Sequence, residues 1–244
     1  MLARLIFAIV LLAHAPLARA GDAAERDILG FSPDGRYFAF EQYGIQDGSG
    51  FPYSEIFLID LSSDSWTEGT PVRIRLEDES QPLAAARRQA LAAAKPFLDK
   101  AQIADNARIF ASNVLYEAVA DPRRMSFRTF YTSFGHLDPA ESDDAEFSLL
   151  LEEIVLPAPK DCPAGDTPLA GFVLKVKHGT GSFEEVYRDR EIPASRRCPL
   201  KYSLSDAVSL IAADGRIQRL VVLVNVFAYG FEGPDRRFVA VTLQ

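Results

Sequence analysis

Side chains suited to nucleophilic catalysis are scarce in this chain. A catalytic serine or cysteine needs a histidine base that an acid orients, and beyond the first twenty residues only His136 and His178 are present. His178 opens the stretch HGTGS, whose backbone N–H groups could hold an oxyanion, but Gly-Thr-Gly-Ser is also an ordinary hairpin turn. We favour the turn, and we keep a secreted hydrolase using His178 as the alternative.

Paired carboxylates could instead hydrolyse a glycosidic bond. With 34 acidic residues, neighbours such as Glu152 and Glu153 are unavoidable, and adjacent residues in a strand point to opposite faces. The acidic stretch 138–146 lacks the spacing of a helix–loop–helix calcium site. No phosphate-binding or dinucleotide-binding glycine motif occurs. We therefore assign no catalytic, cofactor-binding or metal-binding residue, and a carboxylate pair remains the second form of the hydrolase alternative.

Molecular recognition is the chemistry that the sequence favours most. Aromatic side chains on glycine-rich loops add contact area at little entropic cost, and residues 43–55 and 227–235 are two such stretches. The candidate recognition surface consists of Tyr43, Phe51, Tyr53, Tyr229 and Phe231. The alternative is that these rings pack over the ends of a sheet.

The first twenty residues have the pattern of a signal peptide. Arg4 supplies the positive end, and residues 5–13 form an apolar run too short to span a bilayer. Ala18-Arg19-Ala20 is a small-x-small cleavage signal, so we place cleavage between Ala20 and Gly21. We expect an exported protein, periplasmic or extracellular, without stable membrane insertion.

The charge balance argues against nucleic acid as a partner. Removing the signal peptide leaves 24 basic against 34 acidic residues, a net charge of −10. An acidic surface repels phosphate backbones and gives no attraction to anionic lipid. The expected partner is an envelope protein or a small ligand.

Two cysteines, Cys162 and Cys198, are each followed by proline. In an oxidising compartment an even pair most simply forms one disulfide. A metal site with the two histidines would need four scattered ligands without any recognised spacing. We predict the disulfide.

Most of the chain beyond the signal peptide reads as strand. Alternating or continuous apolar patterns predict strands at residues 37–43, 54–61, 72–76, 125–131, 147–156, 172–178, 183–188, 220–227 and 236–243. Residues 220–227 are apolar on both faces apart from one asparagine, which predicts a strand in the middle of a sheet. Short turns between successive strands favour an antiparallel meander.

One substantial helix is predicted near residues 82–104. Ser80 is a plausible N-cap with Pro82 in the first turn. Small and apolar residues recur at helical spacing from 83 to 97, a stripe suited to packing on a sheet. Pro96 should kink or break this helix near its end.

The stretch FSPDGRYFAFEQYG, residues 31–44, resembles the start of a β-propeller blade. Related turns occur at Asp121-Pro122, at Asp214-Gly215 and in GPDRRFVAV at 233–241, but a propeller needs a fixed period of about 40 to 50 residues. These similar turn sequences are explained by the independent use of a turn type that many hairpins favour. An irregular propeller-like fold therefore remains the alternative only.

This stretch, the two Cys-Pro pairs and GFEGPDRRFVAVT at 230–242 resemble a bacterial family of predicted secreted proteins of unknown function. The resemblance implies export and a bacterial source, and it supplies no catalytic residue. We expect one mainly β, antiparallel, sandwich-like domain over residues 21–244, with one packed helix. We expect it to act as a non-enzymatic binding or protein-interaction module of the cell envelope.

Overall fold

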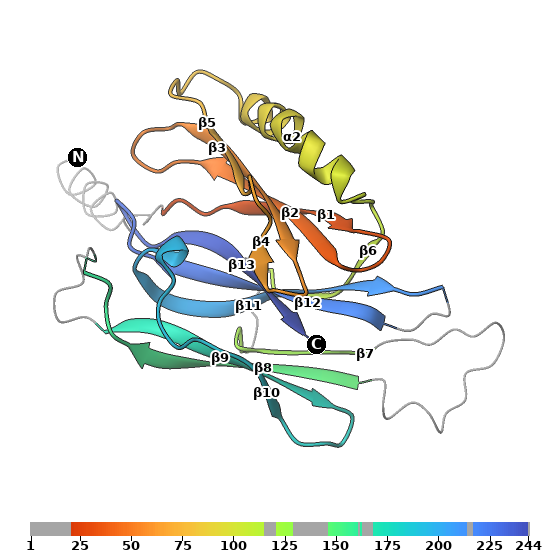
Figure 1. Cartoon of the computed structure of the whole chain (residues 1–244). Helices are drawn as coiled ribbons and strands as arrows, with labels where there is room; N and C mark the ends of the chain where they lie inside the picture. Colours follow the sequence, from red (N-terminus) through yellow and green to blue (C-terminus); the bar gives the residue numbers. More distant parts are fainter. Residues whose placement is uncertain are drawn as a thin grey trace, which may run out of the picture.

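A computed structural model describes residues 21–114, 121–128, 146–160, 162, 168–213 and 217–243. Three antiparallel sheets are stacked in layers, and one long helix covers the outermost face (Figure 1). Among the described residues, no helix has both the length and the apolar character needed to cross a membrane. The predicted signal peptide and the predicted cleavage residue Ala20 lie outside the described residues, and Gly21 is the first residue inside them.

The N-terminal sheet is the predicted meander. Its strands are β1 (Glu25–Phe31), β2 (Tyr37–Ile45), β3 (Pro52–Asp60), β4 (Ser65–Trp66) and β5 (Val72–Arg75). They follow the order β1-β2-β3-β4, and β5 also pairs with β3. Phe38 and Phe40 point from β2 into the interior, as the alternating pattern predicts.

The Asp-Gly turn at residues 32–37 joins β1 to β2. The Asp34 carboxylate accepts hydrogen bonds from the Ser32 hydroxyl at 2.5 Å and the Arg36 N–H at 3.0 Å. Gly35 has a φ of +69°, a conformation that glycine adopts without steric cost. The turn thus joins two paired strands of one open sheet in a stack of three, and the propeller-like alternative is wrong.

The central sheet has the order β13-β12-β11-β6. Its strands are β6 (Ala107–Ser112), β11 (Pro199–Ile211), β12 (Ile217–Ala228) and β13 (Asp235–Leu243). β12 lies between two neighbours and is buried from Leu220 to Val226, because both faces of this sheet are covered. This confirms the prediction of a mid-sheet strand.

The outer sheet has the order β10-β9-β8-β7. Its strands are β7 (Arg124–Arg128), β8 (Glu146–Leu156), β9 (Leu169–His178) and β10 (Glu184–Arg188). β9 and β10 form the predicted hairpin. A short 3-10 helix, η3 (Ala194–Arg196), then leads the chain back to the central sheet.

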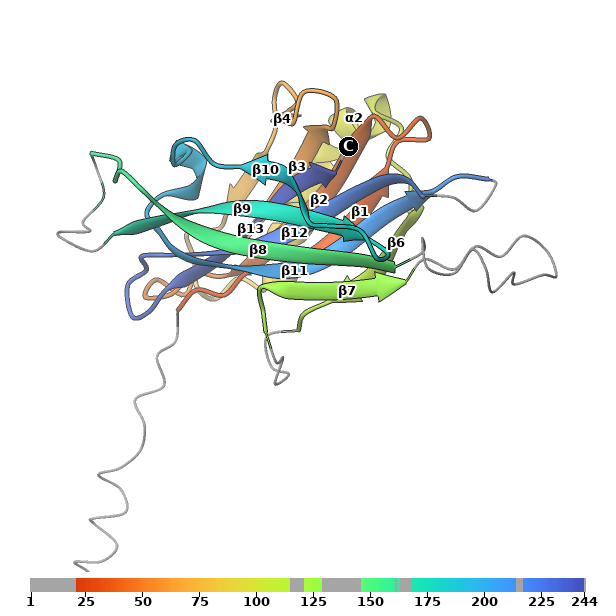
Figure 2. The ribbon, with the colours of Figure 1, turned by 90° about the horizontal axis from the view of Figure 1, so that it is seen from below.

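Two apolar cores hold the three layers together. One lies between the outer and central sheets and includes Phe172, Leu174 and Val222. The other lies between the central and N-terminal sheets and includes Phe40 and Leu223. The sheets are aligned so that β6 contacts both β1 and β7 along one side of the stack. β4, β13 and β10 therefore end the sheets on the opposite side (Figures 1 and 2).

Helix α2 (Leu83–Lys100) covers the outside of the N-terminal sheet. Its buried alanines pack against Ile56 of β3, which confirms the predicted stripe. The predicted cap is wrong, because Pro82 occupies the N-cap position and Ser80 instead hydrogen-bonds Asp78. Of the predicted kink or break at Pro96, the break is wrong, because α2 continues to Lys100. Pro96 lies on the exposed face, where water can bind the carbonyl that its missing N–H leaves unpaired.

The predicted disulfide joins Cys162 to Cys198, with 5.5 Å between their Cα atoms. It anchors the segment after η3 to the connection between β8 and β9. The two cysteines are 36 residues apart.

Replacing both Cys162 and Cys198 by serine should lower the free energy of unfolding by about 4 kcal/mol, because the unfolded chain regains the entropy of the open loop. Urea unfolding followed by circular dichroism measures the difference. An unchanged unfolding midpoint in the double-serine variant would contradict this expectation.

Candidate functional site

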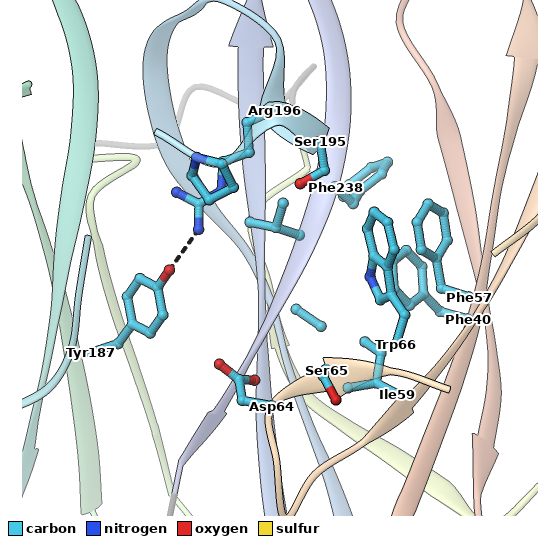
Figure 3. A pocket seen from close by; sticks show the side chains of 13 residues that line it. Phe40, Phe57, Ile59, Asp64, Ser65, Trp66, Tyr187, Ser195, Arg196 and Phe238 are labelled. Atoms are coloured by element: carbon cyan, nitrogen blue, oxygen red, sulfur yellow. Dashed lines mark hydrogen bonds between the residues drawn. The ribbon is translucent and has the colours of Figure 1, made fainter. Parts of the chain in front are cut away.

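A groove runs along the side of the stack on which β4, β13 and β10 end the three sheets. It consists of two cavities of about 280 Å³ and 320 Å³. The two cavities adjoin each other, since both are lined by Phe57, Trp66, Ser195, Arg196, Phe238 and Val239. Residues from all three sheets and from η3 meet here (Figure 3).

One wall of the groove is aromatic. The rings of Phe40 and Phe57 stack with 4.8 Å between centroids, and Trp66 packs edge-on against Phe57 at 5.8 Å. Trp66 is held in place because β4 pairs it with Ile59 of β3. Its side of the wall remains accessible, since Trp66 is 42% exposed. The guanidinium of Arg73 lies 5.5 Å from the centre of the indole.

The opposite wall is polar and is built around Arg196. The Arg196 side chain is only 6% exposed, and its Nη1 lies 2.5 Å from Oδ2 of Asp189. Its Nη2 donates to the hydroxyl of Tyr187, the bond drawn in Figure 3. Asp189 also accepts the N–H of Phe172, so the cluster joins η3 to β9. The buried guanidinium of Arg196 needs these partners, because an unpaired buried charge strongly destabilises the fold.

The floor of the groove is the edge of β13. Phe238, Val239 and Ala240 line the first cavity between the two walls. The N–H of Phe238 donates to the side-chain oxygen of Gln42 at 2.9 Å. Gln42 thereby fixes the N-terminal sheet against this strand.

Charged pairs surround the second cavity. Arg73 pairs with Glu55 at 3.0 Å, and Arg197 lies 3.5 Å from Asp235. Burial raises the pKa of the Asp235 carboxyl above its usual value. Because these charges are paired with one another, the groove suits a ligand with polar groups better than one with a large net charge.

Asp64 stands at the other end of the groove. Its carboxylate accepts a long hydrogen bond from the Thr242 hydroxyl at 3.5 Å. Desolvation beside the groove raises the pKa of this carboxyl, against the lowering effect of Thr242. Asp64 therefore supplies an acceptor at the mouth of the first cavity.

The structure brings the two predicted recognition loops together. The N–H of Glu232 donates to the Asp47 carboxylate at 3.0 Å, and Phe231, 80% exposed, lies against Gly48. The second cavity reaches Ala228 and Asp235, the residues that flank the β12–β13 loop. The loop pair thus stands at one end of the groove. In this loop pair Phe51 and Tyr229 are half-buried and Phe231 is exposed, and none of the three lines either cavity.

The other two predicted recognition residues lie elsewhere. Tyr53 is 6% exposed, and its hydroxyl donates to Asp22 at 2.7 Å, so it belongs to the interior. Tyr43 faces α2, where the guanidinium of Arg87 lies 3.7 Å from the centre of its ring. For these two positions the structure favours the packing alternative.

The residues considered for hydrolysis are not gathered in the groove. His178 is exposed at the end of β9 and packs edge-on against Phe147. Glu152 pairs with Lys175, whereas Glu153 accepts the N–H of Tyr202. The two carboxylates thus have separate structural partners. His136 and residues 138–145 lie outside the described residues.

Sequence reasoning missed the residues that shape the groove, above all Trp66 and Arg196. Trp66 is the single tryptophan of the chain and follows the polar cluster Ser62-Ser63-Asp64. Arg196 precedes Cys198 by two residues, which places it beside the disulfide. These two sequence positions could have drawn attention to Trp66 and Arg196. Neither position predicts a groove, because the sequence does not show which residues lie across from it.

Comparison with known proteins identifies one family. A family model described as "Predicted secreted protein (DUF2259)" matches residues 39–244. A comparison with curated proteins finds no match. Among solved structures, the C-terminal domain of Bacillus megaterium YpeB aligns with 97% of this chain and 94% of its own, at 9% sequence identity and a TM-score of 0.14. A TM-score that low carries no argument about fold or function.

Replacing Arg196 by methionine should lower the free energy of unfolding by about 3 kcal/mol, because the Asp189 carboxylate is left buried without its partner. Arg197→Met is the matched control, since the Arg197 side chain is 63% exposed, and it should cost about 0.5 kcal/mol or less. Urea unfolding measures both, and equal losses would contradict the structural role of Arg196.

Tyr202 should make the protein sensitive to alkali. Burial raises the pKa of its phenol from 10.0 to about 12, against the lowering effect of Arg196. Between these two pH values the phenol ionises only in the unfolded state, so stability falls as pH rises and is intact below pH 10. Wild type should lose about 2 kcal/mol more than Tyr202→Phe over this interval. Urea unfolding at stepped pH tests this, and parallel curves would refute it.

Proposed function

We propose that this chain, which belongs to the family of predicted secreted proteins matched over residues 39–244, is a non-enzymatic binding module of the cell envelope. Its binding site is the groove between β4, β13 and η3. The family description supports export and leaves the activity open.

The observation that carries the proposal is the accessible indole of Trp66 in the wall of a formed groove. Large aromatic side chains usually bury most of their surface in a core, whereas Trp66 keeps 42% of its surface exposed. It faces polar groups across two adjoining cavities of about 280 Å³ and 320 Å³. An apolar platform opposite a few fixed polar groups is the usual composition of a ligand site.

The positions of the other considered residues support binding over hydrolysis. His178 is not among the residues that line either cavity, and it packs against Phe147 at the end of β9. The groove contributes Ser195 and Arg196, but its described lining includes no histidine base beside that serine. The recognition loops at the end of the groove extend the surface available to a partner.

The single tryptophan provides a direct test. Emission from Trp66 should change saturably when a ligand enters the groove, because the ligand replaces water around the indole. Two probes are titrated into the mature protein: a linear heptapeptide selected from a random displayed library, and the neutral oligosaccharide chitotetraose. The proposal expects a saturable change with at least one of them.

The control moves the reporter away from the groove. In the double variant Trp66→Phe, Val155→Trp the indole stands at a position that is 74% exposed on β8, and its emission should not respond. If neither probe changes Trp66 emission, or if both reporters respond alike, the groove is not the binding site.

A further inference from the structure

We propose that the groove binds an extended peptide segment, which pairs as an additional strand with the free edge of β13. This inference rests on the binding function proposed above and names the class of ligand. The occupant is a stretch of another exported polypeptide, recognised through its backbone and through alternate apolar side chains.

The hydrogen-bonding direction along β13 follows from its register. Phe238 stands opposite Asn225 of β12, yet its N–H donates to Gln42 and so points away from β12. Backbone direction alternates along an antiparallel pair, and no irregularity interrupts the β12–β13 register. Ala240 and Thr242 must therefore also direct their N–H and C=O groups away from β12. Ala240 also lines the first cavity, on the side of β13 away from β12, and we infer that its N–H and C=O groups are directed toward the groove.

The chain already pairs an extended segment with the same edge. Ala23 forms a parallel bridge with Arg236. The N–H of Ala24 donates to the Arg236 carbonyl at 3.1 Å, and the Arg236 N–H donates to the Asp22 carbonyl at 2.8 Å. The beginning of the edge thus carries a short strand, and within the described residues β13 pairs with no further strand beyond that point. The N–H of Phe238 is already bonded to Gln42, so the edge offers the backbone groups of Ala240 and Thr242 to a separate peptide.

The accessible part of β13 lacks the usual features that block strand addition. Exposed edges are commonly protected by proline, lysine, bulges or very short strands. Residues 238–243 read FVAVTL and contain none of these residues, and the strand spans nine residues without a bulge. By contrast, β4 at the edge of the N-terminal sheet has two residues. Residues 238–240 of this unprotected edge line the groove, and Thr242 lies just beyond it, where its hydroxyl contacts Asp64.

The two walls define which side chains the peptide should carry. In a strand added to the central sheet, successive side chains point to opposite faces. One set would meet Trp66 and Phe57, and the other would meet Tyr187 and Pro193 (Figure 3). An extended peptide with apolar or aromatic residues at alternate positions matches this arrangement.

The decisive experiment uses the selected heptapeptide and leaves the protein unchanged. Each backbone amide of the peptide is methylated in turn, and affinity is measured by Trp66 emission. Methylation removes the N–H donor of that peptide residue, and the added methyl group keeps the peptide backbone away from the edge of β13. It should therefore weaken binding about tenfold or more at alternate amides and have little effect at the amides between them. A uniform response, or selection that yields no binding peptide, would overturn the inference.

Hydrogen exchange gives the matching readout on the protein. On peptide binding the amides of Ala240 and Thr242 should exchange at least tenfold more slowly, since each gains an acceptor. The amides of Val239 and Val241 already face β12, so their exchange should change little. Protection without this alternation would contradict strand pairing.

A variant pair tests the edge independently. Ala240→Pro removes an N–H that points away from β12 and blocks the approach of a strand, whereas Ala240→Ser keeps the N–H at a small side chain. The proline variant should lose peptide binding and the serine variant should keep it. If chitotetraose binds while no peptide does, the proposed function stands and this inference fails; if neither binds, both fail.

Discussion

The buried ion pair between Arg196 and Asp189 is the interaction on which the groove depends. A guanidinium that is 6% exposed must have its donors satisfied, and here Asp189 and Tyr187 accept them. Because Asp189 also bonds the backbone of Phe172, the pair fixes η3 against the outer sheet. The disulfide at Cys198 holds the chain immediately after η3. The polar wall is therefore rigid on both sides of the residues that line the cavities.

The same kind of pair recurs at the other boundaries between layers. Asp206 of the central sheet binds Arg26 of β1 at 2.5 Å, and Glu41 of β2 binds Arg87 of α2 at 2.7 Å. Both carboxylate side chains are fully buried. Apolar faces pack without strong directional preference. A buried ion pair, in contrast, forms only when the two layers bring its charged groups into contact. We infer that these pairs set how each layer is aligned on the next, which in turn places β4, β13 and β10 on one side.

Sequence reasoning succeeded where the determinants are local. The apolar run at 220–227, the alanine stripe of α2 and the cysteine pair each carry their own signal, and all three predictions are confirmed. It failed at Pro96, because the outcome depends on which face of the helix is exposed. It could not find the groove, since Trp66, Arg196 and Phe238 meet only after three separate sheets have stacked. The position of Tyr53 inside the core likewise follows from a distant partner, Asp22.

The recessed position of β13 explains how a free sheet edge can be kept in an exported protein. An exposed edge is a template for pairing with any other strand, which leads to aggregation. Here the edge lies between the Trp66 wall and the Tyr187–Arg196 wall, with η3 beside it. We infer that these walls hinder the approach of a whole sheet from another molecule and leave room for one extended segment. The walls that give the site its side-chain preference therefore also restrict what can pair with its backbone.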